Sequence, residues 1–233
     1  MARNQVILSD FIISFAWLWS GSLNKFFVCK FLGLGSKPSG EVIENILDLL
    51  SMYCFAWLCK TYSGAYNPLS ESVLSGAISG NNTRILYTVG SRIPAQALGS
   101  IIAVRLITEF LPEIGYEPLL SVGILQGALT EGALTFSIIV ISLEAAQSHP
   151  NNFFLKTWIC SVSKIGLHIL GSNVTGGYMN PASAMGWAYV QGSHINKGHI
   201  FVHWLAPIGA ALLGVWTFRL FIQPKEKAGG KTA

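Results

Sequence analysis

The sequence predicts an all-α membrane protein with six transmembrane helices and two re-entrant half-helices, arranged as an inverted repeat. Three observations lead to this fold class: a low charged fraction, six long apolar windows, and two Asn-Pro motifs far apart in the chain. Of the 233 residues, 51% are apolar and only 11% are charged. A soluble domain carries about 25% charged residues. The chain therefore lacks the polar surface that water requires, and its mean hydropathy of +0.49 agrees.

Six windows reach the roughly 20 mostly apolar residues that a membrane span needs. They are 6–28, 41–61, 84–107, 120–143, 153–172 and 199–222. The second window is the weakest, because Glu41, Glu44 and Asp48 occupy its first turns. Each half of the chain holds an odd number of windows, so the second half must enter the membrane in the opposite direction.

Two Asn-Pro motifs interrupt this series of windows, one in each half. Asn67-Pro68 follows the second window and Asn180-Pro181 follows the fifth. Asparagine is a strong helix N-cap and proline suits the first helical turn. The small or apolar residues after each motif number only about ten, which is too few to span a membrane. Each segment therefore predicts a half-helix about 15 Å long.

The spacing of these motifs indicates a repeat within one channel domain, 1–233. The two asparagines are 113 positions apart (180 − 67), and Pro94 and Pro207 are separated by the same 113 (207 − 94). We expect repeat 1 over about 6–107, repeat 2 over about 120–222, and a basic cytoplasmic tail over 223–233.

The paired motifs predict a pore. Backbone that leaves a helix at membrane depth is tolerated only inside protein or beside a watery cavity. Two loops inserted from opposite faces would bring both half-helix N-termini together at mid-membrane, where their partial positive charges repel cations and orient water. The asparagine amides would donate to a solute and the unwound carbonyls would accept. We therefore expect a passive passage for water or small neutral solutes.

Four charged residues within the spans need partners. Asp10 and Glu131 each stand early in the first window of a half, and we expect them to hold loop N–H groups in place. Arg92 and Lys164 can pair with acids or reach an aqueous face, and the sequence leaves this open.

Other function classes find little support in the sequence. The net charge of +4 comes from single Lys and Arg residues without a basic stripe, so we expect no nucleic-acid partner. No catalytic pairing, metal-ligand spacing or phosphate-binding loop stands out, so we expect no enzyme activity, cofactor or metal.

The distribution of basic residues near the span ends predicts the orientation in the membrane. With a cytoplasmic N-terminus, eight basic residues face the cytoplasm and five face the other side. The eight are Arg3, Lys60, Arg84, Lys156, Arg219, Lys225, Lys227 and Lys231. Both termini are therefore expected in the cytoplasm.

With these motifs the chain resembles the aquaporins, or major intrinsic proteins, over about residues 5–222. Within that family it looks most like the second subgroup of plant small basic intrinsic proteins. The likeness is carried by Tyr66–Leu69, Gly127–Gly132, His168–Ser172 and Met179–Ala182. The resemblance implies a homotetramer with one pore in each subunit, in the endoplasmic-reticulum membrane of a plant cell.

The resemblance also carries the family's four-residue selectivity constriction onto this chain. It implies His168, Gly177, Ser183 and, on the second span, Asp48, with Leu47 as the alternative. Water-selective members have an arginine where this chain has Ser183. Its loss removes a fixed cation, five donors and bulk, so we expect a wider and less positive constriction. The permeant stays open between water, a larger neutral solute and hydrogen peroxide.

A second departure from the family is Leu69, which replaces the small alanine that Ala182 keeps in the second motif. A leucine here should push the half-helices apart or rearrange the pore lining.

Two alternatives to the passive channel remain: a non-conducting or weakly conducting membrane scaffold, and an ion-coupled transporter that uses Asp10, Glu131 or Asp48.

Overall fold

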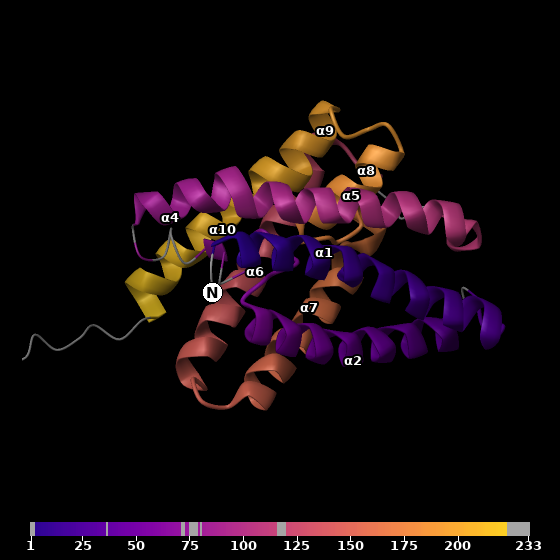
Figure 1. Ribbon diagram of the computed structural model, residues 1–233, viewed down its shortest axis with the longest axis horizontal. Coiled ribbons are helices and arrows are strands. Elements are labelled where there is room, and N and C mark those ends of the chain that lie inside the picture. The colour runs from indigo at the N-terminus through magenta and orange to yellow at the C-terminus, as the bar shows by residue number, and fades with distance from the viewer. Residues whose placement is uncertain are drawn as a thin grey trace, which may run out of the picture.

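A computed structural model describes residues 3–35, 37–70, 73–74, 79, 81–115 and 120–222. Within these ranges six helices are long and apolar enough to cross a membrane, and Figure 1 shows α1, α2 and α5 running near the longest axis while α6, α7 and α10 cross it obliquely. Their bounds are Arg3–Phe31, Pro38–Tyr62, Asn82–Phe110, Ile124–Ser148, Phe153–Thr175 and Lys197–Phe221. The six predicted spans are confirmed, with ends that differ from the apolar windows by a few residues.

Short π-helical stretches, labelled η, lie within or at the ends of three of these spans. The elements in chain order are α1 Arg3–Phe26, η1 Phe27–Phe31, α2 Pro38–Tyr62, α4 Asn82–Tyr87, η2 Thr88–Arg92, α5 Ile93–Phe110, the 3₁₀ turn η3 Pro112–Ile114, α6 Ile124–Ser148, α7 Phe153–Thr175, α8 Pro181–Val190, α9 Lys197–His199, η4 Ile200–Leu205, α10 Ala206–Thr217 and η5 Phe218–Ile222.

Two of the π-helical stretches explain how the repeated prolines fit inside membrane helices. Thr88–Arg92 comes just before Pro94, and Ile200–Leu205 comes just before Pro207. Proline has no N–H to donate, and its ring crowds the carbonyl four residues earlier. A π-turn widens the helix at that point and relieves the conflict. The repeat thus extends from the sequence to the local helix geometry.

The second half-helix is present as expected. It is α8, ten residues long, and it begins at Pro181 with Asn180 as its N-cap. The first half-helix falls largely on residues outside the described ranges. After Ser70 only residues 73, 74 and 79 of that segment are described, and all three are helical. Its length therefore stays a prediction.

The two repeats are interlocked in the core. One cluster joins α1 and α5 of the first repeat to Trp187 of α8. The other joins α6 and α10 of the second repeat to Leu69 of the first Asn-Pro motif. Each re-entrant segment therefore packs against helices of the opposite repeat. Gly186 in α8 makes this possible on one side, because a Cβ there would lie 2.7 Å from the Ser100 carbonyl oxygen of α5.

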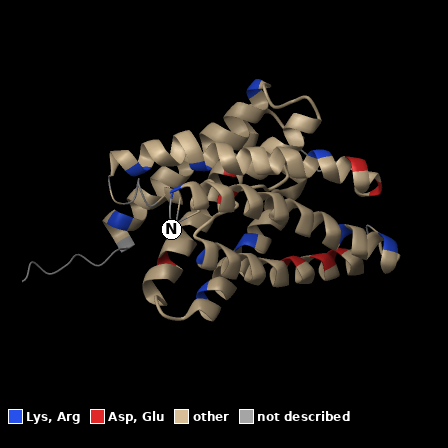
Figure 2. Ribbon diagram, in the orientation of Figure 1, with Lys and Arg blue, Asp and Glu red and all other residues tan. Residues whose placement is uncertain are grey.

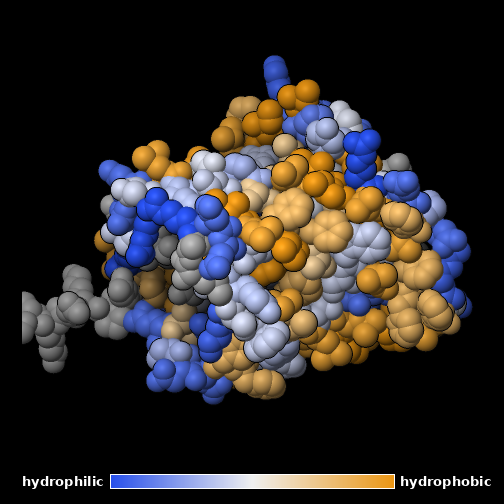
Figure 3. All heavy atoms as spheres, in the orientation of Figure 1, coloured by the Kyte–Doolittle hydropathy of each residue, from blue (hydrophilic) through white to orange (hydrophobic). Residues whose placement is uncertain are grey.

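The outer surface is apolar over most of the helix length. Large exposed apolar side chains come from all six spans, for example Leu8, Leu50, Leu98, Leu125, Leu170 and Leu212. In Figure 3 hydrophobic side chains cover the middle of the visible face, and hydrophilic ones gather toward the two ends of the long axis. In Figure 2 most of the helix length is uncharged, with only a few charges at mid-helix. Such a surface suits lipid as the solvent. The predicted basic tail, 223–233, lies outside the described residues.

The close contact between α1 and α5 generates a stability prediction. A Cβ on Gly99 would lie 2.3 Å from the Phe11 carbonyl oxygen, whereas a Cβ on Gly209 would meet nothing within 4 Å. We expect Gly99→Ala to destabilise the fold by about 1–3 kcal/mol through overpacking. Gly209→Ala is the matched control and should leave stability equal or slightly higher, because alanine favours helix. Thermal unfolding of the purified protein in detergent measures both variants. Equal unfolding midpoints for the two would contradict the packing seen here.

Candidate functional site

The two Asn-Pro motifs meet in the middle of the helix bundle. The Asn67 side-chain amide donates to the Met179 carbonyl at 2.9 Å, and the Asn180 amide donates to the Tyr66 carbonyl at 3.0 Å. Tyr66 and Met179 are the residues directly before the two asparagines, so the contact is reciprocal. Such hydrogen bonds hold the tips of both loops within side-chain reach of each other.

Each asparagine also caps the turn that follows it. The Asn180 side-chain oxygen accepts from the Ala182 N–H at 3.1 Å and the Ser183 N–H at 3.4 Å, while the Asn67 oxygen accepts from the Leu69 N–H at 2.9 Å. Each asparagine therefore uses its side-chain oxygen to cap the following turn and its side-chain NH₂ to donate to the opposite loop. An asparagine can do both, because its amide carries an acceptor and two donor hydrogens.

A buried carboxylate holds the first loop. Asp10 of α1 is fully buried and accepts from the Ala65 N–H at 2.7 Å. Arg92 pairs with the same carboxylate through Nε at 2.7 Å and a terminal nitrogen at 2.9 Å. This two-pronged geometry is the arrangement in which an arginine best compensates a buried acid. The sequence left open whether Arg92 pairs with an acid or reaches an aqueous face, and in the structure it pairs with Asp10.

A second buried carboxylate holds the second loop. Glu131 of α6 accepts from the Tyr178 and Met179 N–H groups, both at 3.0 Å, and from the Thr175 hydroxyl at 2.7 Å. Among the residues that the structure describes, hydrogen bonds and no ion pair compensate this buried carboxylate. Both acids contact loop backbone, which agrees with the scaffold role expected for them.

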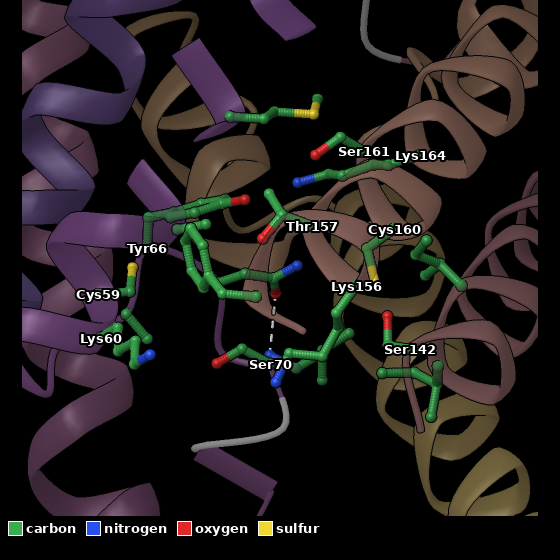
Figure 4. A pocket seen from close by; sticks show the side chains of 18 of the residues that line it. Cys59, Lys60, Tyr66, Ser70, Ser142, Lys156, Thr157, Cys160, Ser161 and Lys164 are labelled. Atoms are coloured by element: carbon green, nitrogen blue, oxygen red, sulfur yellow. Dashed lines mark hydrogen bonds between the residues drawn. The ribbon is translucent and has the colours of Figure 1, made fainter. Parts of the chain in front are cut away.

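A cavity of about 570 Å³ lies between the meeting point and the end of the bundle where α1 begins; we refer to it as the N-side cavity. Asn67 lines its inner end, and Lys60 and Lys156 line it at the end of α2 and the start of α7. Figure 4 shows Lys60 and Lys156 among the side chains around the hollow, with Tyr66 and Lys164 facing one another across it. The described lining contains three lysines and no Asp or Glu.

A smaller cavity of about 190 Å³, the far-side cavity, lies on the other side of the motifs. Its lining includes Asn180 and the four positions implied for the constriction: Asp48, His168, Gly177 and Ser183. Leu47 is not among the lining residues. The two cavities share three lining residues, Met52, Lys164 and Met179, so they adjoin one another beside the Asn-Pro motifs.

His168 and Gly177 are fixed against each other in this cavity. The His168 Nδ1 lies 3.1 Å from the Gly177 carbonyl oxygen. A carbonyl only accepts, so Nδ1 carries the hydrogen, and Nε2 of the neutral ring is left as an acceptor. Gly177 has a φ of +56°, and a Cβ there would lie 2.6 Å from the His168 carbonyl oxygen. A side chain at position 177 would therefore break the contact that orients the histidine.

The other two positions are held by neighbouring polar groups. Asp48 accepts from the Asn24 amide of α1 at 2.8 Å. Ser183 accepts from the Asn180 amide at 2.7 Å. The Asn180 amide thus has partners for both of its hydrogens, Ser183 and Tyr66, whereas the one contact found for the Asn67 amide leaves its second hydrogen for a solute.

Leu69 does not separate the loops. Its side chain is 3% exposed and packs with Ile139, Leu143, Ala211 and Val215 of α6 and α10. The asparagine contacts across the two loops remain within ordinary hydrogen-bond length despite the larger residue. At the tips of the two loops the expected separation is therefore not seen, because α6 and α10 accommodate the added volume.

Sequence reasoning did not foresee the place of Lys164. The signal was present, since a lysine inside a span points to a functional role. The periodicity of α7 alone, however, could not tell an aqueous face from a packed one.

Among the described residues no group of three His, Cys, Asp or Glu side chains is placed to hold a metal ion.

Comparisons with known proteins agree with this architecture. The family model for the major intrinsic proteins matches residues 60–218. "Probable aquaporin SIP2-1" of Arabidopsis thaliana is 45% identical over 226 residues, covering 96% of this chain and 94% of the relative. "Aquaporin SIP2-1" of Zea mays is 42% identical over 225 residues, covering 96% and 90%. The aquaglyceroporin structure from Plasmodium falciparum has a TM-score of 0.75 at 14% identity, covering 96% of this chain and 98% of that chain, which supports the fold.

The buried ion pair at the first loop generates a second prediction. Arg92→Met should destabilise the protein by about 3–5 kcal/mol, because it leaves the Asp10 carboxylate buried without its cation. The double variant Asp10→Asn with Arg92→Met removes the charge and should recover part of that loss. Thermal unfolding in detergent distinguishes the two. The assignment is wrong if the single variant unfolds like the unaltered protein.

Leu69 generates a third prediction. Leu69→Ala should lower stability by about 2–5 kcal/mol by opening a cavity between α6 and α10, and it should not raise water permeability. Leu69→Met conserves volume and should cost less than about 1.5 kcal/mol. Unfolding and vesicle shrinkage are measured on the same preparations. Conduction that appears only in Leu69→Ala would contradict this packing account and favour the scaffold alternative.

Proposed function

Because this chain belongs to the major intrinsic protein family, and is therefore a membrane channel for water or small solutes, we propose that the passage runs within one subunit between the two cavities. The observation that carries the route is the reciprocal contact of Asn67 and Asn180. It puts both Asn-Pro motifs at the boundary where the N-side and far-side cavities adjoin. Transport through such a channel needs no enzyme chemistry and no cofactor.

A neutral solute finds hydrogen-bond partners along this route. The second hydrogen of the Asn67 amide can donate to it, and Nε2 of the neutral His168 ring can accept from it. The N-terminus of α8 adds a partial positive charge beside Asn180. These groups favour the oxygen of water or of a small hydroxyl- or amide-bearing solute over a cation.

We assign the selectivity constriction to Asp48, His168, Gly177 and Ser183. All four line the far-side cavity, which supports the assignment carried over from the family. Ser183 and Gly177 present little side-chain bulk, so the constriction admits neutral solutes larger than water. Water, glycerol, urea and hydrogen peroxide are the permeants to compare.

The ion-coupled alternative has less support from the geometry. Asp10 is engaged by Arg92 and a loop N–H, and Glu131 by two loop N–H groups and a hydroxyl. Neither carboxylate lines a cavity in the described linings, so neither is placed to carry an ion along the route. Asp48 does line one and stays the candidate for that alternative. Flux that ignores pH and voltage gradients would reject it.

The cellular setting is proposed from the family resemblance and the charge distribution. We propose a homotetramer in the endoplasmic-reticulum membrane with both termini in the cytoplasm. The apolar surface of all six spans supports a multi-pass membrane protein. Chemical crosslinking in native membranes tests the tetramer, and protease protection of terminal tags, together with an endoplasmic-reticulum marker, tests the orientation and compartment.

A stopped-flow panel on reconstituted vesicles tests the proposed function. We expect water and at least one of glycerol, urea and peroxide to cross faster than in protein-free vesicles. Ser183→Arg should reduce passage of the larger solutes by about tenfold or more and water by less, because the arginine adds bulk and five donors. Ser183→Ala is the control, because it changes the residue without narrowing the pore. Rates equal to protein-free vesicles for every solute would reject the channel.

A further inference from the structure

Lys164 lies where the two cavities adjoin. It is on α7, four residues before His168, so its Cα lies about 6 Å along the helix axis from that of His168. Because α7 ends next to the second loop, Lys164 is displaced from His168 toward the N-side cavity. It lines both cavities, and only Met52 and Met179 share this property among the described residues. A solute that moves between the cavities must pass these three side chains.

Two aromatic rings hold the ammonium group in place. The Lys164 Nζ lies 4.9 Å from the ring centroid of Trp17 and 4.8 Å from that of Tyr66. Those two rings are stacked with centroids 4.1 Å apart. A cation close to aromatic faces is attracted by their electron density. Figure 4 shows Lys164 extending toward Tyr66 across the hollow.

No acid neutralises this cation at short range. Lys164 forms no ion pair with any carboxylate of the described residues. Glu44 and Asp48 line the far-side cavity, and Lys60 and Lys156 line the N-side cavity. The charged side chains of the described N-side lining are therefore further cations, while toward the far side Asp48 attracts the ammonium without forming an ion pair with it.

The matching position of the first repeat carries no charge. Lys164 stands 16 residues before Asn180 (180 − 164), and Ser51 stands 16 residues before Asn67 (67 − 51). Ser51 also lines the far-side cavity, where its hydroxyl accepts from the Asn24 amide. The repeat therefore does not require a lysine on α7.

We propose that Lys164 is the specificity-determining cation of this pore. It excludes monovalent cations and protons at the junction of the two cavities. This chain has serine at position 183, so no arginine there can supply the charge. The inference rests on the proposed function, since it assigns charge selection to the same passage. A neutral solute passes the ammonium and can accept a hydrogen bond from it, whereas a cation meets a like charge at close range.

The test measures proton flux and water flux on the same vesicles of full-length protein. A pH-sensitive dye inside reports proton entry driven by a potassium diffusion potential, and stopped-flow shrinkage reports water. The variants are Lys164→Met and Lys164→Gln, which remove the charge, and Lys164→Arg, which keeps it. Lys156→Met is the matched control, because it removes a lysine of the same helix and the same cavity that lies away from the junction.

We expect Lys164→Met and Lys164→Gln to raise proton flux about tenfold or more while water flux stays at least at the unaltered level. Lys164→Arg and Lys156→Met should stay as proton-tight as the unaltered protein. The proposal is overturned if the uncharged variants pass water yet remain proton-tight, or if Lys156→Met leaks as much. It also fails if the protein folds or conducts water only with a cation at position 164, because Lys164 would then be structural.

Failure of the proposed function gives a different result. An unaltered protein that passes neither water nor the neutral solutes rejects the passive channel. Proton leakage through the uncharged Lys164 variants would even then support the assignment of Lys164, and its absence would overturn it.

Discussion

A bilayer interior has no water to satisfy backbone groups that leave a helix, and the rest of this structure depends on that constraint. The chain breaks its helices twice at membrane depth, so both loops need partners from the protein. Asp10 and Glu131 bind the loop N–H groups from behind, and Asn67 and Asn180 bind the opposite loop at its tip. Once these groups are paired, the remaining polar atoms of the loops can face an aqueous passage.

Crosswise packing makes the two loops one unit with the helices. Trp187 of α8 belongs to the core of α1 and α5, and Leu69 belongs to the core of α6 and α10. A change in one repeat is therefore transmitted to the re-entrant segment of the other. This arrangement also explains why Leu69 is tolerated, since its side chain lies against the long helices of the opposite repeat as well as beside the N-side cavity.

The sequence predicted the spans, the second half-helix and the acids that contact the loops, because each has a local signature: apolar length, an Asn-Pro cap, or a charge inside a span. It did not predict what depends on where a long side chain points. The pairing of Arg92 with Asp10 joins residues 82 positions apart. The packing of Leu69 depends on volume left between α6 and α10. The π-helical stretches before Pro94 and Pro207 relieve the conflict between each proline and the preceding turn, and an apolar window carries no sign of them.

The two repeats share a backbone plan and differ in charge, and that difference bears on selectivity. The first repeat compensates its buried acid with Arg92, so the pair is close to neutral, and the second uses hydrogen bonds to Glu131 alone. Among the described residues, Lys164 lies near the junction of the cavities without an ion-pair partner, beside the positive N-terminus of α8. Fields of the same sign add, so under the role proposed for Lys164 a cation meets its highest barrier there. In that proposal the serine at position 183 leaves charge selection to the middle of the pore, and a wide mouth is compatible with a cation-tight passage.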